Sequence, residues 1–533
     1  MRSDLLLPTF ALMVVISVAG QAYCRQVQSS AAVTISPETT YVSGPLNADG
    51  TVNYLKAFNE RASKGVLPES NAAALLVRAM GRELLATQSP DHVLKLLGIR
   101  ELAEEGDCFL PLESRITTAT SRKTALEHIL TGPWHPRQHE EAYQWLKSNR
   151  TPLEILQEAV AMTSCHFPLV GSQGRQTIAD ALIINENLCL QAGQALVSEA
   201  MLKLRSGDSA GCWARLISAH RLARLIARQP LLKTNTVALA IERVACGGDR
   251  ALLISGRLQP DQTNQVLADM KGLPAMGRMT EAVGFGERCA HLSLVMHLIQ
   301  HGPKLMDERI LGATGPGQGE PIRQDEWQWV RQMVYWDGIL KSINNRWDAI
   351  AGAFAKKTGQ VLWKDTESFA RETASLLASA EQVAAGVSEA LVNQRRLYQA
   401  TVLSLLQDPS SDNTYLSSKI TGLIQNLLLS AHNPPLLKAA RLRDQATAEG
   451  RLSQTAAALV ARKQSEGEYP EKLSQLTPAQ LAEVPEDLFS GKPLRYYRQG
   501  KHWLLYSVGP NGTDDGGRCD PRGPADDIAI ILR

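Results

Sequence analysis

Acidic side chains are concentrated at the end of the chain, in a pattern suited to binding a cation. The closing stretch, YSVGPNGTDDGGRCDPRGPADDIAIILR, carries five aspartates with glycines among them. They are Asp514, Asp515, Asp520, Asp526 and Asp527. Calcium takes six to eight oxygen ligands from flexible loops, and glycine lets carbonyls turn inwards because it adopts positive φ freely. The stretch therefore predicts either a calcium-binding loop or an acidic turn in solvent, since turns favour these residue types anyway.

Other patterns that would indicate chemistry are weaker. The loop is not an EF-hand, because the twelfth position counted from Asn511 is Arg522 rather than glutamate. The sequence contains no Walker loop, G-x-G-x-x-G, H-E-x-x-H or G-x-S-x-G motif. His297 and His301 are four residues apart, so they share a helix face and could hold a metal. Histidines near a helix end also stabilise its last carbonyls, which is the simpler interpretation of this pair.

We expect helices to form most of the chain. Apolar residues make up 44% of the 533 residues and aromatic residues 5%, which favours helix packing rich in alanine and leucine. The clearest unit is a helical hairpin from 185 to 230, which breaks at Gly207-Asp208 and carries Trp213 and Leu216 in a strip with three-four spacing. No second copy follows at a period of about 34 residues. We expect a mainly α fold, with a large helical-hairpin body of tetratricopeptide-like packing that is not a repeat array.

The composition changes after Gly467, where strand-like pieces follow a long helix. The helix begins at Pro434-Pro435, and the pieces read LRYYR, HWLLYSV and DIAIIL. Gln499-Gly500, between the first two, is a hairpin signal. We therefore expect residues 434–533 to form a small C-terminal α+β module, in which a three-stranded antiparallel sheet packs on the long helix.

The first residues predict export. Arg2 precedes an uncharged run from Leu5 to Cys24, which is short for a membrane span and suited to the apolar part of a secretory signal. We expect residues 1–24 to be a signal peptide or an N-terminal anchor, 25–45 a linker, and 46–433 the helical body, with 312–321 as a surface loop or a hinge. Contact with the membrane is expected only through the N-terminal segment, if it is not cleaved.

The charge and the cysteine spacing exclude some classes of partner and site. The net charge is +2, without the concentrated basic face that nucleic acid needs, so we expect no nucleic-acid partner. The eight cysteines include no C-x-x-C pair, which argues against a zinc ribbon or a redox motif. Most lie in apolar helical stretches and are expected to be buried small hydrophobic residues. Disulfides in an oxidising compartment stay open, because pairing cannot be read from the sequence.

Four stretches near the end of the chain follow one another in a recognisable order. They read EGEYPEKLSQL, VPEDLFSGKPLRYY, LLYSVGPNGTDDGG and ADDIAI, after a long helix. This order resembles the soluble part of the major pseudopilin of type II secretion, with its G-x-Y-P turn, P-D-P-x-G-x-P-x-x-Y segment, Y-x-S-x-G-x-D-G-x-x-G-G segment and closing D-D-I strand. The resemblance covers under a fifth of the chain, and its specificity comes from several matches in a fixed order.

In that family the loop between the last two strands binds calcium through carbonyls and aspartates. The resemblance implies Ca²⁺ as cofactor, with these ligands: the carbonyl of Val508 and the side chains of Asn511, Asp526 and Asp527. Asn511 stands where the family has an aspartate, which removes a charge. The loop is also longer here, so that three further aspartates compete for the same role, namely Asp514, Asp515 and Asp520.

The whole layout points to the cell envelope. The N-terminus lacks the processing site of a pilin, and the helix after Pro434 is too charged to lie in a membrane. The layout resembles large uncharacterised envelope proteins of planctomycete-type bacteria, and this resemblance does not suggest any particular activity. We expect an exported, non-enzymatic protein, in the periplasm or anchored to the inner membrane, whose calcium-stabilised module serves assembly or contacts a protein partner. The alternatives are a hydrolase with a site in the helical body and a helical scaffold that binds peptides.

Overall fold

A computed structural model describes most of the chain between residues 33 and 532. The described residues are 33–86, 89–100, 102, 108–171, 177–178, 181, 183–302, 331–332, 334–376, 378, 418, 421–422, 424–426, 428–429, 434–500, 502–520 and 524–532. The expected signal or anchor segment 1–24, the start of the expected linker and the expected hinge 312–321 lie outside the described residues. Within the described parts, no helix has both the length and the apolar character needed to cross a bilayer.

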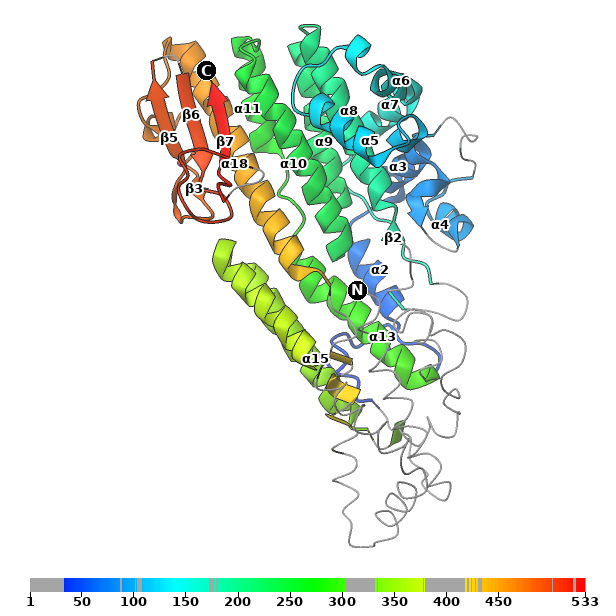
Figure 1. Ribbon diagram of the computed structural model, residues 1–533. Helices are drawn as coiled ribbons and strands as arrows, with labels where there is room; N and C mark the ends of the chain where they lie inside the picture. Colours follow the sequence, from blue (N-terminus) through cyan, green and yellow to red (C-terminus); the bar gives the residue numbers. More distant parts are fainter. Residues whose placement is uncertain are drawn as a thin grey trace, which may run out of the picture.

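The chain is mainly helical, as predicted, with a small three-stranded sheet near its C-terminus (Figure 1). The first helices are α2 (Tyr54–Ala62), α3 (Ala72–Met80), α4 (Pro90–Leu96), α5 (Ala119–Ile129), α6 (Glu140–Ser148) and α7 (Arg150–Ala159). Short 3-10 helices lie at Pro68–Ser70, Arg82–Leu84, Leu112–Ser114 and Pro136–Gln138. The two-residue strands β1 (Leu85–Ala86) and β2 (Ile183–Ile184) pair antiparallel.

Longer helices form the centre of the molecule. They are α8 (Glu186–Arg205), α9 (Ser209–Ile226), α10 (Leu232–Ile254) and α11 (Pro260–Gly272). Then come α12 (Met279–Glu281), a π-helical turn (Ala282–Glu287), α13 (Arg288–His301), α15 (Trp336–Lys356) and helical residues 359–376. Helices α8, α9 and α10 pack against one another, and α10 and α11 pack against α18 (Leu436–Glu466). The long helix α18 therefore belongs to the packing of the body as well as to the C-terminal module.

The predicted helical hairpin of α8 and α9 is confirmed. Gly207 takes a φ of +88° between the two helices, a conformation that glycine adopts without strain. The Asp208 side chain then accepts a hydrogen bond from the Gly211 N–H at 2.7 Å, which caps α9. Trp213 and Leu216 are buried, and the Trp213 indole N–H donates to Asp269 on α11 at 2.8 Å. The turn residues and the apolar strip read from the sequence therefore set this hairpin.

The three predicted strands form one antiparallel sheet in the order β5 (Arg495–Gln499), β6 (His502–Ser507) and β7 (Ile528–Leu532). Leu505 lies between Tyr496 and Ile530 in the register, and this face packs on α18. Leu504 lies between Tyr497 and Ile531 on the opposite face. A separate hairpin of β3 (Glu486–Asp487) and β4 (Lys492–Pro493) precedes the sheet, after a 3-10 helix at Leu473–Leu476.

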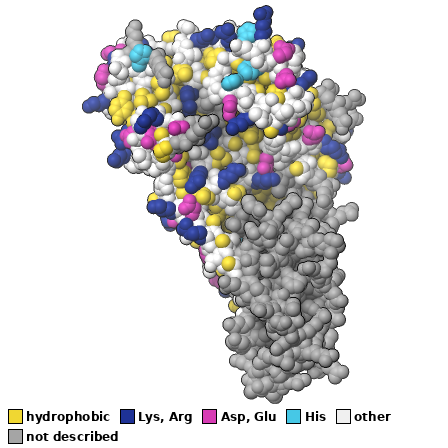
Figure 2. Space-filling model, viewed as in Figure 1, with side chains coloured by type: hydrophobic (Ala, Val, Ile, Leu, Met, Phe, Trp, Pro, Cys, Tyr) yellow, Lys and Arg dark blue, Asp and Glu magenta, His cyan; other side chains and the backbone are white. Residues whose placement is uncertain are grey.

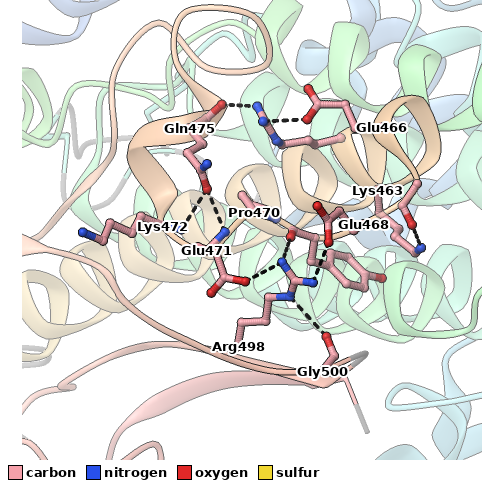
Figure 3. A network of polar contacts seen from close by, with 12 residues as sticks. Lys463, Glu466, Glu468, Pro470, Glu471, Lys472, Gln475, Arg498 and Gly500 are labelled. Carbon is pink, nitrogen blue, oxygen red and sulfur yellow. Dashed lines mark hydrogen bonds and ion pairs between the residues drawn. The ribbon is translucent and has the colours of Figure 1, made fainter.

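A network around Arg498 fixes the turn between α18 and the sheet (Figure 3). The Arg498 guanidinium donates to Glu471 at 2.8 Å, to Glu468 at 3.0 Å and to the Tyr469 carbonyl. The Tyr496 hydroxyl donates to the Pro470 carbonyl at 2.9 Å. These contacts hold the EGEYP segment against β5, so the glycine-tyrosine-proline turn has a structural role in this chain.

The described part of the expected linker lies against α15. The Asn344 side chain donates to the carbonyls of Glu38 and Thr39 at 2.9 and 2.8 Å, and Lys341 pairs with Glu38 at 2.8 Å. Thr39 and Thr40 are buried. Residues 33–45 are thus packed rather than extended into solvent. The expected domain boundary at residue 434 stays a prediction. Because α18 packs on α10 of the body, the stability of the C-terminal module should be measured on the full chain.

Most of the described cysteines are buried, as the sequence indicated. The buried thiols are those of Cys165, Cys189, Cys212, Cys246 and Cys289. Cys108 is half-buried and Cys519 is exposed. Burial raises the pKa of the Cys165 thiol to about 12 and that of Cys212 to about 12, so both are neutral packing groups at ordinary pH.

Candidate functional site

A buried aspartate holds the base of the acidic loop. Asp487 of β3 accepts hydrogen bonds from the Ser507 hydroxyl at 2.6 Å, the Ser490 hydroxyl at 2.9 Å and the backbone N–H groups of Phe489 and Val508 at 3.2 and 3.1 Å. Each carboxylate oxygen therefore has two donors. Sequence reasoning missed Asp487. The turn in which Asp487 accepts from the Phe489 N–H could have been predicted from the sequence, because aspartate favours such turns. The hydrogen bond from Ser507 could not, because it joins residues twenty positions apart.

Asn511 is the hub of the loop. Its backbone N–H donates to Asp526 at 3.1 and 3.2 Å, and its side-chain amide donates to Asp515 at 2.9 Å and to the Pro524 carbonyl at 2.7 Å. Its side-chain oxygen accepts from the Thr513 N–H at 2.6 Å. An aspartate at this position would repel Asp515, whereas the asparagine amide binds it. The departure from the pseudopilin pattern therefore has a physical role in this longer loop.

Asp527 is the deepest acidic residue of the loop, at 1% exposure. One oxygen, Oδ2, accepts from the Gly517 N–H at 2.7 Å and from the Asp515 N–H at 3.1 Å. The other, Oδ1, is buried and has no hydrogen-bond partner among the residues that the structure describes. Burial raises the pKa of Asp527, and the two N–H donors oppose that rise. A buried carboxylate oxygen without a donor indicates a site for a cation or a water.

Asp526 lies beside it, against the turn at the start of the loop. Burial also raises the pKa of Asp526, while the Asn511 N–H lowers it and Asp515 raises it. Gly509 takes a φ of +68°, and a Cβ there would lie 2.1 Å from the Asp526 carbonyl oxygen. Only glycine allows this close approach. Asp520 is exposed, and its N–H donates to the Ala525 carbonyl at 2.7 Å.

Asp514 lies apart from these groups, on the outer face of the sheet. Its Oδ1 accepts from the Tyr506 hydroxyl at 2.7 Å and from the Gly516 N–H at 3.1 Å, and its Oδ2 lies 3.4 Å from Arg495 Nε. The Tyr506 hydrogen bond lowers the pKa of Asp514. Of the seven predicted ligands, the structure thus brings Asn511, Asp515, Asp526 and Asp527 together. Val508 is buried at the loop base, where its N–H binds Asp487.

Although these four residues are neighbours, their carboxylate oxygens do not converge on one point. In the described part of the chain, the only group of three or more His, Cys, Asp or Glu residues with ligand atoms within 4.8 Å of one another is His220, Glu242 and Cys246, in the helical body. A cation at the loop would therefore take carbonyl and water oxygens as well as carboxylates, which calcium accepts.

The His220 group is an ion-pair network. His220 Nδ1 lies 2.9 Å from Glu242 Oε2, and Nε2 lies 3.1 Å from Asp249 Oδ2. Burial alone lowers the pKa of His220, but the two carboxylates outweigh it and raise the pKa to about 10. Both ring nitrogens then carry protons, so neither has a lone pair for a metal. Arg224 also binds Glu242 at 2.7 and 3.1 Å. Sequence reasoning missed this network, because its residues come from separate helices.

The histidine pair of α13 lies at the end of that helix. The rings of His297 and His301 are 4.5 Å apart, and His301 is the last residue of the helix. The neighbouring Gln300 side chain donates to Asp49 at 2.9 Å and to Thr51 at 2.7 Å. The shared face that the spacing predicted is therefore present.

A cleft of about 800 Å³ separates the acidic loop from the helical body. Asn511, Asp526 and Asp527 line one side, and Arg243, Arg250 and Arg441 line the other. Arg243 forms an ion pair with Glu449 at 3.0 Å, and Arg441 lies over the Trp363 ring at 5.2 Å. On the face seen in Figure 2, basic and acidic side chains are likewise mixed over body and module. The predicted loop thus forms one wall of a cleft that the sequence did not reveal.

Comparison of the chain with protein-family models, curated proteins and solved structures finds no match. The resemblance to pseudopilins therefore rests on the order of its motifs, and the role of the loop has to be argued from its geometry.

Proposed function

We propose that this chain is an exported, non-enzymatic protein of the cell envelope, whose C-terminal module binds Ca²⁺ at the acidic loop and contacts a protein partner. The observation that carries the proposal is the buried Asp527 carboxylate, whose Oδ1 has no hydrogen-bond partner in the described part of the chain. A buried polar atom without a partner costs about 1–3 kcal/mol. A hard cation at this oxygen removes that cost.

The neighbouring groups supply further ligands. Asp526 offers a second carboxylate beside Asp527, and Asp515 is close enough to accept from the Asn511 amide at 2.9 Å. The Val508 carbonyl and the Asn511 side-chain oxygen complete the set that the pseudopilin resemblance implies. Calcium would supply positive charge between carboxylates whose pKa values burial raises, and it would tie the start of β7 to the end of β6. Its role in this proposal is structural.

The buried ionisable network around His220 in the helical body favours a structural role for its residues. His220, Glu242 and Arg224 bind one another, so their charges are already neutralised within the fold. A general acid or base needs instead to reach a substrate proton. Export is supported by the apolar run from Leu5 to Cys24. Cell fractionation with sequencing of the mature N-terminus tests it, and full-length protein in the cytosol would contradict it.

Calcium binding is tested on the full chain by titration calorimetry and by thermal melts with calcium, with magnesium and with chelator. We expect one calcium per chain and a rise in the melting temperature of the transition that includes the module. A hundredfold excess over the dissociation constant stabilises by about 2.7 kcal/mol. Magnesium should do much less, because it requires octahedral geometry and loses water reluctantly. Identical melts in all three buffers would leave the loop as a solvated acidic turn.

A further inference from the structure

The edge of strand β7 faces the cleft between the module and the body. Ile528 points to one face of the sheet, and Ala529 and Ile531 point to the other. All three nevertheless line the cleft. The cleft therefore runs along the edge of the strand rather than over one face. In the sheet order β7 is the last strand, paired only with β6. Among the described residues, no further backbone hydrogen bond involves 528–532. An edge of this kind is a template for another strand.

The wall opposite this edge carries three arginines and Glu449, which is already paired with Arg243. Arg243 and Arg250 come from α10 and Arg441 comes from α18, and these helices pack against each other. The Arg250 Nε is buried without a hydrogen-bond partner in the part of the chain that the structure describes. A guanidinium binds carboxylates through two parallel hydrogen bonds. Arg250 lines the cleft, and no described residue accepts a hydrogen bond from its Nε.

Apolar and aromatic groups surround these charges. Ile531 is 40% exposed, which is high for an isoleucine, and Trp363 lines the same cleft under Arg441. A small anion would use only the arginines. An extended peptide would use the free backbone edge, the exposed Ile531 side chain and the arginines together.

We propose that an extended, acidic segment of a protein partner binds in this cleft, as an added strand on the edge of β7, with a carboxylate held by Arg250. The inference specifies the partner contact of the function proposed above and rests on it. It does not require calcium. Main-chain hydrogen bonds to β7 would supply affinity, and Arg250 would favour a segment with a carboxylate over one with a lysine at the facing position.

The test uses the full chain and a fluorescein-labelled octapeptide of alternating aspartate and valine, followed by fluorescence anisotropy. We expect binding, no binding of the matching lysine–valine peptide, and at least a tenfold loss when alternate peptide amides are N-methylated. Hydrogen exchange should slow at the amides of 528–532 on binding. Equal binding of the N-methylated peptide, or competition by free glutamate as effective as by the unlabelled peptide, would overturn strand addition.

Arg250→Gln should weaken the aspartate–valine peptide by about tenfold or more, because a charge-assisted hydrogen bond is lost. Arg221→Gln, an exposed arginine of α9 outside the cleft lining, is the matched control and should bind as the wild type does. Equal affinity of both variants would place the peptide elsewhere. Repeating the binding in chelator separates the two proposals. A calcium response without peptide binding contradicts only the strand site, and peptide binding without a calcium response contradicts only the calcium loop.

Discussion

His220 on α9 and Glu242 on α10 form a buried ion pair, with Nδ1 2.9 Å from Oε2. The exposed fractions of the two side chains are 3% and 7%. Asp249, about two turns further along α10, takes the other ring nitrogen at 3.1 Å. Two helices that are otherwise joined by apolar packing are thus also joined by charge, at the centre of the body.

Replacing His220 by leucine should destabilise the chain by roughly 3–5 kcal/mol, because a buried charge loses its partner. Asp249 would be left without its histidine, while Glu242 would keep Arg224. Urea unfolding measures the change, with the exposed neighbour Arg221→Leu as control. A loss below about 1 kcal/mol would mean that water or rearrangement replaces the histidine.

The same pair predicts the pH dependence of stability. The pKa of His220 is raised from 6.5 to about 10, so its contribution is complete below pH 6.5 and is lost as the pH rises through about 10. Burial alone raises the pKa of Glu242, but His220 and Arg224 lower it from 4.5 to about 2, so its contribution is complete above pH 4.5 and is lost as the pH falls towards 2. Both contributions are complete between pH 4.5 and pH 6.5, so the urea midpoint of unfolding should be highest in that range. In His220→Leu the decline above pH 6.5 should become shallower.

Asp487→Ala should loosen the base of the acidic loop. The substitution leaves the buried Ser507 hydroxyl and the Val508 N–H without their acceptor, at a cost of roughly 2–4 kcal/mol. Hydrogen-exchange mass spectrometry should detect faster exchange in 502–508. Glu486→Ala changes the exposed neighbour and should leave that exchange as it is in the wild type. Equal exchange in both variants would contradict the role given to Asp487.

The two sides of the acidic loop should respond differently to substitution. Asp526→Asn should abolish the calcium response, because this carboxylate lies beside Asp527 at the cleft. Asp514→Asn should at most weaken the response, because Asp514 binds Tyr506 and Arg495 on the outer face of the sheet. Titration calorimetry on the full chain compares the two variants. A larger loss in Asp514→Asn would move the candidate site to the outer face.

Two glycine substitutions test the packing of the body. A Cβ on Gly286, in the π-helical turn, would lie 1.7 Å from the Pro230 carbonyl oxygen, so Gly286→Ala should cost roughly 2–3 kcal/mol or more. Gly247, inside α10, has open space around its Cβ position. Gly247→Ala should stabilise by about 0.5–1 kcal/mol, because alanine is the better helix former. Thermal melts of the two variants should therefore shift in opposite directions.

Local rules explain what could be read from the sequence. The break at Gly207-Asp208 and the hairpin signal at Gln499-Gly500 depend on residues a few positions apart, and the structure contains both of them. Helix caps and turns are set by nearby backbone and side-chain groups. The mainly α fold with its small C-terminal sheet follows from such signals. The collection of aspartates around Asn511 was also visible, because it lies in one loop.

The tertiary structure alone decided which of those aspartates lie close to one another. Asp514 and Asp515 are adjacent in sequence, yet Asp514 faces Tyr506 on the sheet and Asp515 faces Asn511. The ion pair of His220 with Glu242, and the arginines opposite β7, join helices and strands that lie far apart along the chain. No periodicity in one segment encodes such distances, because they result from how α10 and α18 pack against each other and against the sheet.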